Sequence, residues 1–338
     1  MVNTTHAVYK ATDRSYSAIL KKEIHALATL ANFGTHKIGQ IDIVVSEMVS
    51  NLVKHADEGV ILVKLIEEDN KQGIEIISID EGPGMTDVAR MISDGTSTKN
   101  TLGQGLGAMN RLCDVFQVYS QKDWGTVVLV RMFEEELSKF KKPAIAVIKT
   151  LIIPKHGETA CGDAFYYTAS DTHLKLFLGD GLGHGVEAAA AVEKAGEAFM
   201  HCSETDPGEI IRFINTAVKK TRGLVGTVVV FDIDARKWQI CGVGNIATKI
   251  INPTNSKNHL SYNGIIGLNI PNTLNAQEVA YEKGQRIIMC SDGIKSRWDS
   301  TKYPSVFRYD NTVFCAGLFK DFARHTDDTS VMVCSLNV

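Results

Sequence analysis

The chain has 338 residues, of which 44% are apolar and 22% are charged, and its formal net charge is −3. The profile is that of an ordinary globular protein, and the length suggests about two domains of roughly 150 residues each. The near-zero net charge argues against a general nucleic-acid binder or a polybasic membrane-surface protein, and no apolar run approaches the roughly 18 residues that cross a bilayer.

The N-terminus lacks the basic start and the apolar stretch of a secretory signal. The seven cysteines are scattered singly, without the close pairing of a structural zinc site, and their odd number fits reduced thiols better than a disulfide framework. These observations predict a cytoplasmic protein.

The N-terminal part of the chain predicts helices followed by strands. Apolar residues recur at helical spacing over 13–33 and 35–55, with Gly34 as a stop between the two helices. A short helix is expected in the glycine-rich stretch from Gly82 to Gly107, and strands are expected at 59–67, 73–80, 115–121 and 126–133. Helices grouped with a mostly antiparallel sheet predict an α+β two-layer sandwich.

The second predicted helix carries a carboxylate and an amide one turn apart. Glu47 and Asn51 are four residues apart, with Lys54 three residues further, so the three side chains share one face. Such a pair can hold a water and a magnesium ion together, although each residue by itself also suits an ordinary exposed helix position.

Two glycine-containing segments follow this helix. Asp80 ends an apolar strand and runs into Gly82-Pro83-Gly84, where a carboxylate can accept a hydrogen bond from an exocyclic amine, although a tight turn has the same composition. Glycines then alternate over 103–107 before a predicted helix, where free backbone N–H groups can cradle phosphates. The spacing is not that of a Walker loop, and no βαβ unit surrounds it.

In this order, the three motifs and Gly125-Thr126 in a late hairpin resemble the N, G1, G2 and G3 boxes of the GHKL (Bergerat-fold) ATPases, over about residues 5–133. The short span between Gly84 and Gly103 resembles the anti-sigma-factor serine kinases of the RsbT-like type, and no phospho-accepting histidine box is evident upstream. The resemblance implies a histidine-kinase-like ATPase fold that binds ATP and Mg²⁺.

By this resemblance, Asn51 is the magnesium ligand, Glu47 is the general base and Asp80 reads the adenine. The other nucleotide-binding residues that it implies are Lys54, Gly82, Gly84, Met85, Thr98, Lys99, Gly103, Gln104, Gly105, Leu106, Gly107 and Thr126.

A charged stretch from Glu134 to Pro143 follows an apolar strand-like run and ends in proline. It predicts a boundary near residue 138, with domains at 1–138 and 139–338. Beyond it, strands at several positions flank a central pair of helices at 186–200 and 207–221, which predicts two sheets with helices outside. The remaining expected elements are strands at 144–153, 163–169, 173–178, 224–233, 237–242, 286–290 and 329–336, and a helix at 313–324.

Acidic residues flank four of these apolar runs, namely Asp163, Asp180, Asp292 and the pair Asp327-Asp328. Carboxylates gathered from strand ends are how a fold builds a two-metal centre with a bridging water as nucleophile. Each of them by itself also suits a turn.

The set resembles the PPM (PP2C-type) serine/threonine phosphatases of the SpoIIE-like branch, over about residues 144–336. The resemblance rests on Gly-Asp-aromatic at 162–166, Asp-Gly-x-Gly-His-Gly at 180–185, Ser-Asp-Gly at 291–293 and Asp-Asp-x-Ser at 327–330, while Cys161 departs from the family's usual glycine. It implies a four-layer αββα fold.

The same resemblance implies two Mn²⁺ or Mg²⁺ ions, bridged by Asp163 and Asp180 with help from the Gly181 carbonyl. Asp292 and Asp327 complete this predicted site, with Asp328 as the second choice for the last position. His184 is interpreted as a cap of the helix near residue 186 and is left outside the catalytic set.

The leading hypothesis is a bifunctional switch regulator. Its N-terminal domain phosphorylates serine or threonine on a STAS-domain partner of a stressosome or partner-switching pathway, and its C-terminal domain hydrolyses such phosphoesters. To avoid a futile cycle, the two domains are expected to act on different substrates or to be gated relative to one another.

The alternative is an N-terminal module that binds nucleotide to regulate the phosphatase or to sequester a partner without transferring phosphate, and the intact Glu47 argues against it. A nucleotide-independent scaffold ranks lowest. Neither nucleic acid nor membrane is expected as a partner, and a homodimer is left open.

Overall fold

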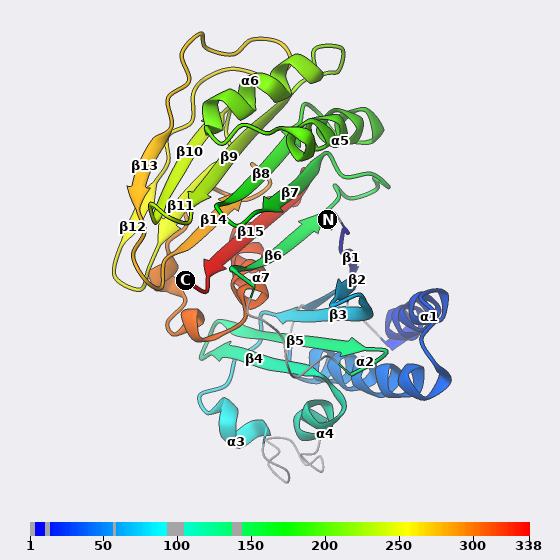
Figure 1. Cartoon of the computed structure of the whole chain (residues 1–338). Helices are drawn as coiled ribbons and strands as arrows, with labels where there is room; N and C mark the ends of the chain where they lie inside the picture. The colour runs from blue at the N-terminus through cyan, green and yellow to red at the C-terminus, as the bar shows by residue number, and fades with distance from the viewer. Residues whose placement is uncertain (1–3, 11–13, 57–58, 93–104, 137–143) are drawn as a thin grey trace. The chain divides into compact units, whose positions relative to one another are not determined.

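The computed structural model describes residues 4–10, 14–56, 59–92, 105–136 and 144–338, and it divides into two compact units (Figure 1). The N-terminal unit comprises His6–Lys142 together with Arg308–Ala316, and the C-terminal unit comprises the rest of the chain. The boundary predicted near residue 138 falls outside the described residues and stays a prediction.

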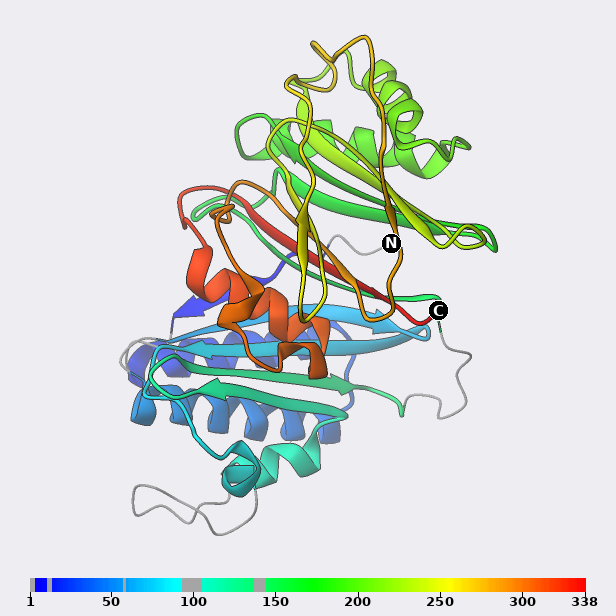
Figure 2. The same ribbon diagram turned by 90° about the vertical axis from the view of Figure 1, so that its left-hand side faces the viewer.

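The N-terminal unit contains one antiparallel five-stranded sheet in the order β1-β2-β3-β5-β4. Its strands are β1 (Ala7–Lys10), β2 (Gly59–Glu68), β3 (Lys71–Asp80), β4 (Val115–Gln121) and β5 (Gly125–Phe133). Its helices are α1 (Arg14–Leu30), α2 (Thr35–His55), α3 (Val88–Ile92) and α4 (Gly105–Leu112). Figure 2 shows α2 running along one face of this sheet.

Helix α2 has the bounds that its sequence predicted, because its apolar residues recur every three or four positions and all face the sheet. Ile41, Val45 and Met48 are almost completely buried and pack with Ile61 and Ile76 of the strands. This packing fixes the rotation of the helix, and Glu47 and Asn51 therefore lie beside the core, where they are half-buried.

The opposite face of the sheet carries charged residues that are buried. Because side chains alternate along a strand, Lys64, Glu75 and Arg131 point away from the helices, and Glu75 is directly opposite both of the others in the sheet register. The segment Arg308–Ala316 belongs to the same unit, and its Asp310 accepts two hydrogen bonds from the Arg131 guanidinium, at 2.8 and 3.0 Å.

The C-terminal unit contains two antiparallel five-stranded sheets, in the orders β13-β10-β9-β8-β7 and β12-β11-β14-β15-β6. Helices α5 (Val186–His201) and α6 (Pro207–Ala217) pack on the first sheet (Figure 1). The two sheets enclose a second apolar core that includes Leu176, Phe231 and Met289.

The strands of these two sheets are β6 (Ala146–Ile153), β7 (Asp163–Ala169), β8 (His173–Gly181), β9 (Leu224–Asp232), β10 (Lys237–Val243), β11 (Ala247–Ile251), β12 (Ser256–Asn258), β13 (Gln277–Ala280), β14 (Arg286–Cys290) and β15 (Thr329–Leu336). Two short 3₁₀ helices, Ser300–Lys302 and Val306–Arg308, precede helix α7 (Asn311–Phe322).

Antiparallel pairing brings the acidic motifs to one edge of the C-terminal unit. Asp163 opens β7 and Asp180 lies near the end of β8, and the two are directly opposite each other in register. Asp292 follows β14, and the Asp327-Asp328 pair precedes the neighbouring strand β15. The fold thus gathers residues that are up to 165 positions apart in the sequence, from Asp163 to Asp328.

Candidate functional sites

In the N-terminal unit, Glu47 lies against the start of helix α4. A Cβ atom built on Gly105, the first residue of α4, would be 2.7 Å from the Glu47 carboxylate. Glu47 and the predicted phosphate-binding residues Gly105, Leu106 and Gly107 therefore belong to one region. Thr98, Lys99, Gly103 and Gln104 lie outside the described residues.

The carboxylate of Asp80 is fixed by the backbone at the end of β3. Its Oδ1 atom accepts hydrogen bonds from the N–H groups of Gly82, at 2.8 Å, and Thr126, at 3.1 Å. Gly125 has φ +111°, and a side chain there would collide with the Asp80 carbonyl, so this close approach of the two strands requires glycine.

Ser120 is a member of this region that sequence reasoning missed. Its hydroxyl accepts a hydrogen bond from the Met85 N–H at 2.8 Å, donates to the Gly125 carbonyl at 2.8 Å and lies 2.9 Å from the Thr126 hydroxyl. Because Ser120 is opposite Thr126 in the β4–β5 register, pairing the two predicted strands would have revealed it.

Helix α2 ends against the same turn. A Cβ atom on Gly82 would be 2.5 Å from the carbonyl oxygen of His55, and one on Gly84 would be closer still to the carbonyl oxygen of Gln121. The structure thus joins the end of α2, the Asp80–Gly84 turn and the β4–β5 hairpin, while Lys54 on the last turn of α2 is exposed. An acidic hydrogen-bond acceptor, a glycine-containing turn and the start of a helix are features that can serve nucleotide recognition.

In the C-terminal unit, Asp163 is only 3% exposed, and Ser291 holds one of its oxygens. The Ser291 hydroxyl donates to Asp163 Oδ2 at 2.5 Å and accepts a hydrogen bond from the Ser330 N–H at 2.9 Å. Asp163 Oδ1 is buried and has no hydrogen-bond partner among the described residues. Such an oxygen is costly to leave unpaired, so Asp163 is a candidate ligand for a cation.

Burial and the neighbouring carboxylates raise the pKa of Asp163 to about 7 and that of Asp180 to about 9. For Asp163 the Ser291 hydrogen bond works in the opposite direction, whereas Asp163, Asp292 and the Asp327-Asp328 pair all raise the pKa of Asp180. A divalent cation between these groups would relieve both the burial and the repulsion.

The two aspartates before β15 have different environments. Asp328 is 4% exposed, and its oxygens accept hydrogen bonds from the Lys155 N–H at 2.8 Å and the Gly162 N–H at 2.9 Å. Asp327 is half-buried, and its Oδ1 accepts only a local hydrogen bond from the Asp328 N–H at 3.0 Å among the bonds we identify. Asp328 therefore clamps the 155–162 loop, and Asp327 is the better candidate for a metal ligand.

Asn245 is a further residue that sequence reasoning missed, because it lies in a turn that carries no motif. Its side-chain amide donates to Asp292 Oδ2 at 3.0 Å and orients that carboxylate. In the described part of the chain, no group of three acidic, histidine or cysteine side chains is arranged closely enough to hold a metal ion. The aspartates share one edge of the fold, with their backbone positions set by the strands.

The interpretation of His184 as a helix cap is wrong. The residue that caps α5 is Gly185, which makes no side-chain cap hydrogen bond, and the His184 ring instead pairs with Glu158, with 2.6 Å between Nδ1 and Oε1. Because Gly185 has φ +77°, the chain turns before the helix in a way that directs the His184 side chain toward the 155–162 loop.

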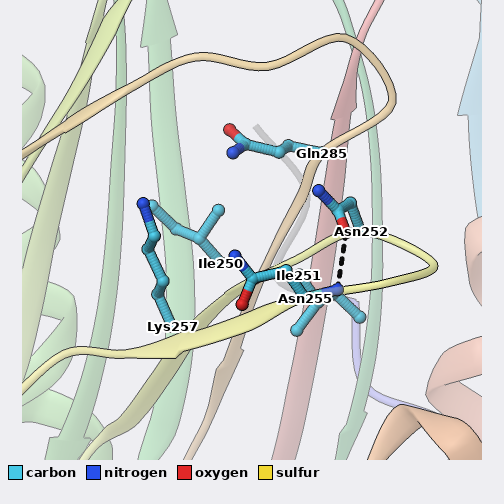
Figure 3. Close-up of a pocket in the computed structure, with 6 residues that line it drawn as sticks. All are labelled: Ile250, Ile251, Asn252, Asn255, Lys257 and Gln285. Carbon is cyan, nitrogen blue, oxygen red and sulfur yellow. Dashed lines mark hydrogen bonds between the residues drawn. The ribbon is translucent and has the colours of Figure 1, made fainter.

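A small hollow lies at the other end of β14 from Asp292. Figure 3 shows the six residues that line it, which come from the β11–β12 hairpin and from Gln285, the residue before β14. A five-residue strand spans roughly 16 Å, so this hollow is not part of the acidic region. The Asn255 N–H donates to Asn252 Oδ1 at 2.7 Å between two of the lining residues.

Two protein families match the chain. Residues 9–132 match the histidine kinase-like ATPase domain, and residues 170–336 match the stage II sporulation protein E (SpoIIE) family. Among curated proteins, serine/threonine-protein kinase RsbT of Bacillus subtilis (strain 168) is 35% identical over 96 residues, which cover 28% of this chain and 72% of RsbT. Phosphoserine phosphatase RsbX of the same organism is 29% identical over 153 residues, which cover 44% of this chain and 75% of RsbX.

Solved structures agree with these matches. A chain reported under the bacterial stressosome, as a modular system adapted to control secondary messenger signalling, is 28% identical with a TM-score of 0.51, covering 56% of this chain and 99% of that one. RsbX in complex with magnesium is 21% identical with a TM-score of 0.51, covering 66% of this chain and all of RsbX, and shows the shared fold. In the described residues, no helix is long and apolar enough to cross a membrane.

Proposed function

Since the chain belongs to the RsbT kinase family through its N-terminal part and joins to it a SpoIIE-type phosphatase domain similar to RsbX, we propose that it is a bifunctional switch-protein kinase and phosphatase. We place the functional boundary near residue 138 and propose that the protein acts in the cytoplasm. The observation that carries the proposal is that each half supplies its own set of reactive groups, Glu47 beside α4 in one and the aspartate edge in the other.

For the kinase half, we propose that Glu47 accepts the proton of the attacking serine or threonine hydroxyl of a protein substrate. Asn51, one turn along α2, supplies an oxygen ligand for Mg²⁺, and Asp80 accepts a hydrogen bond from the adenine amine. ATP, when bound, supplies the phosphoryl group. The proposal is supported by the rigid attachment of Asp80 to Gly82 and Thr126 and by the position of Glu47 at the start of α4.

For the phosphatase half, we propose that Asp163, Asp180, Asp292 and Asp327, with the Gly181 carbonyl, hold two Mn²⁺ or Mg²⁺ ions. Such ions, when bound, generate a nucleophilic water and neutralise charge on the phosphoryl oxygens. The unpartnered oxygen of Asp163 and the raised pKa of Asp180 support this assignment, because both describe carboxylates that lack a counter-charge. Ser291 and Asn245 orient two of the ligands.

As the protein substrates of the two halves we propose STAS-domain partners within a partner-switching or stressosome-like assembly. RsbT is a serine/threonine-protein kinase and RsbX is a phosphoserine phosphatase. A fusion of two such domains can add phosphate to protein side chains and remove it. The similarity to a stressosome chain supports the assembly. The two halves are expected to act on different partners or under different signals, because otherwise ATP would be consumed without net change.

The test uses the full chain with ATP, Mg²⁺ and a STAS-domain protein, and it follows phosphorylation by mass spectrometry. We expect Glu47→Gln to bind ATP normally but to lose transfer, whereas Glu23→Gln, a change at an exposed glutamate on α1, should retain both. Full transfer by Glu47→Gln would overturn the assigned base. Absence of transfer in the unaltered chain, with ATP binding intact, would favour the second candidate function, a nucleotide-binding regulatory module.

The phosphatase half is tested on the phosphorylated partner. The double variant Asp180→Asn, Asp292→Asn should lose hydrolysis while retaining ATP binding by the N-terminal unit. Retained hydrolysis would contradict the proposed metal centre.

A further inference from the structure

The loop between β8 and α5, residues 182–185, contains one basic side chain and has a second beside it, and each of the two is paired with a glutamate. His184 pairs with Glu158, and Arg222, in the turn before β9, pairs with Glu187 on the first turn of α5. This loop begins two residues after Asp180, so both side chains belong to the neighbourhood of the proposed metal centre. Neither has a role in the function described so far.

The guanidinium of Arg222 lies over the backbone of this loop. Its Nη1 atom would be 3.1 Å from a Cβ atom built on Gly183, which has φ +84° and leaves that space open. The Leu182 N–H donates to the carbonyl of Gly223 at 3.1 Å, so the turn that carries Arg222 is attached to the loop that carries Asp180. The position of the turn that carries Arg222, relative to the loop, is thus set by the backbone.

The pairing of Arg222 with Glu187 is a weak restraint. The two side chains are 49% and 69% exposed, and an exposed ion pair contributes about 0–1 kcal/mol. A phosphate dianion offers the guanidinium a stronger bidentate contact than a solvated carboxylate does. Arg222 can therefore leave Glu187 when a phosphoester arrives, without loss of any buried contact.

The net negative charge of the proposed metal centre also favours a cationic side chain that binds the phosphate. Five carboxylates line this edge, from Asp163, Asp180, Asp292 and the Asp327-Asp328 pair, and two divalent ions do not fully neutralise them. A doubly charged phosphomonoester would still meet net negative charge at short range. Arginine stays charged at every relevant pH and forms the planar fork that matches two phosphate oxygens, which the imidazole of His184 does not.

We propose that Arg222 binds the phosphate of the serine or threonine phosphoester substrate and that Glu187 is its resting partner, which the phosphate displaces. This inference rests on the proposed phosphatase function and adds to it a substrate-binding residue and a competing carboxylate. It predicts opposite effects for the two members of the ion pair. Loss of Arg222 weakens phosphate binding, whereas loss of the Glu187 charge strengthens it.

The experiment uses the full chain loaded with Mg²⁺, with para-nitrophenyl phosphate as substrate and inorganic phosphate as a calorimetric ligand. For Arg222→Met we expect KM and the phosphate Kd to rise about tenfold or more, with kcat changed much less, as for a lost bidentate contact. Arg222→Lys should recover part of the loss. Glu187→Gln should lower both constants about two- to threefold.

Arg212→Met is the matched control, because Arg212 forms a similar exposed pair with Glu209, 3.2 Å apart, on α6. It should leave KM and the phosphate Kd unchanged. Unchanged phosphate binding in Arg222→Met, or equal losses in Arg222→Met and Glu187→Gln, would overturn the proposal, since a structural pair would respond in the same direction to either change.

These outcomes are distinct from failure of the phosphatase function itself. If the Mg²⁺-loaded unaltered chain hydrolyses no phosphoester, the proposed function fails, and phosphate calorimetry still tests Arg222 separately. If the unaltered chain is active and the Arg222 variants behave like the Arg212→Met control, the phosphatase function stands and the inference about Arg222 is wrong.

Discussion

Two buried carboxylate regions in this chain have opposite surroundings. In the N-terminal unit, Glu75 is 2% exposed, and burial alone would raise its pKa, but Lys64, Arg131 and His6 outweigh burial and hold the pKa well below its usual value. In the C-terminal unit, Asp163 is 3% exposed, and burial raises its pKa with further help from the charges of Asp328 and Asp292, since no cation among the described residues outweighs burial there. Equal burial thus gives opposite shifts in pKa.

The difference separates a structural carboxylate from a functional one. Glu75 accepts a hydrogen bond from Arg131 Nε at 2.7 Å and has cations across both neighbouring strands, so its charge is compensated within the protein. In the described part of the chain, the hydrogen bonds to the C-terminal aspartates come from Ser291, Asn245 and backbone N–H groups rather than from cations, and a bound metal ion would supply the missing counter-charge. An uncompensated acidic edge is therefore a better indicator of a metal site than acidity or burial alone.

The largest effect is expected when the buried Glu75 of the N-terminal unit loses one of its cationic partners. Arg131→Met leaves Glu75 and Asp310 without their guanidinium, and removing one member of a buried pair costs about 3–5 kcal/mol. We expect a loss of this size in the free energy of unfolding of the N-terminal unit, measured by urea denaturation with ATP-binding as a second probe.

A matched variant sharpens this prediction. The solvent-screened pair Lys237–Glu278 in the C-terminal unit has 2.6 Å between its charged atoms, yet Lys237→Met should leave stability nearly unchanged. If Arg131→Met costs no more than Lys237→Met, the buried network is not what stabilises the sheet.

The second prediction divides the two neighbouring aspartates. Asp328→Asn removes a carboxylate that holds two backbone N–H groups, at Lys155 and Gly162, and should cost about 1–3 kcal/mol of stability, by thermal or urea unfolding of the metal-free chain. Asp327→Asn should leave the stability of the metal-free chain nearly unchanged but weaken binding of Mn²⁺ in calorimetry. The reverse pattern would exchange their roles.

The third prediction concerns pH. The native pKa values of Asp163 and Asp180, about 7 and about 9, exceed those of the unfolded chain, so the native metal-free protein binds more protons and loses stability as pH rises through this range. Differential scanning fluorimetry should show the Tm of the metal-free C-terminal unit falling by a few degrees between pH 5 and pH 8.

Saturating Mg²⁺ or Mn²⁺ should abolish this fall, because the ions replace the protons as counter-charges. Glu75 has the opposite sign, since its lowered pKa contributes stability above about pH 4.5 that is lost in acid. A metal-free Tm that rises from pH 5 to pH 8 would contradict the assignment of the acidic edge.

Much of the fold follows from local patterns. Helix α2 and strands β3 and β5 have bounds close to those expected, because their buried residues follow one clear period each. Strands β1, β12 and β13 were not expected, because most of their residues are exposed and they carry no apolar alternation. Such edge strands are specified by their neighbour rather than by their own sequence.

The motif residues of the candidate sites could be predicted from the sequence, but the residues that hydrogen-bond to them could not. Asp163 and Asp180 stand out because each borders an apolar strand, and the register of β7 and β8 explains why the two meet. Ser120 and Asn245 contact motif residues that lie 35 and 47 positions away, and no local pattern encodes such contacts. Ser291 lies within a predicted motif, but its hydrogen bond to Asp163, 128 positions away, follows only from the tertiary structure. Arg222 was missed for the same reason, since only the tertiary structure places it over Gly183.

The inclusion of Arg308–Ala316 in the N-terminal unit has a consequence for how the protein is made. Arg131 finds Glu75 56 residues away, but its other acceptors, Asp310 and Thr312, are about 180 residues further along the chain. During synthesis, Arg131 emerges from the ribosome well before Asp310 and Thr312, which are translated only near the end of the chain. The first unit is therefore completed last, and a gene cut between the two halves would remove part of it.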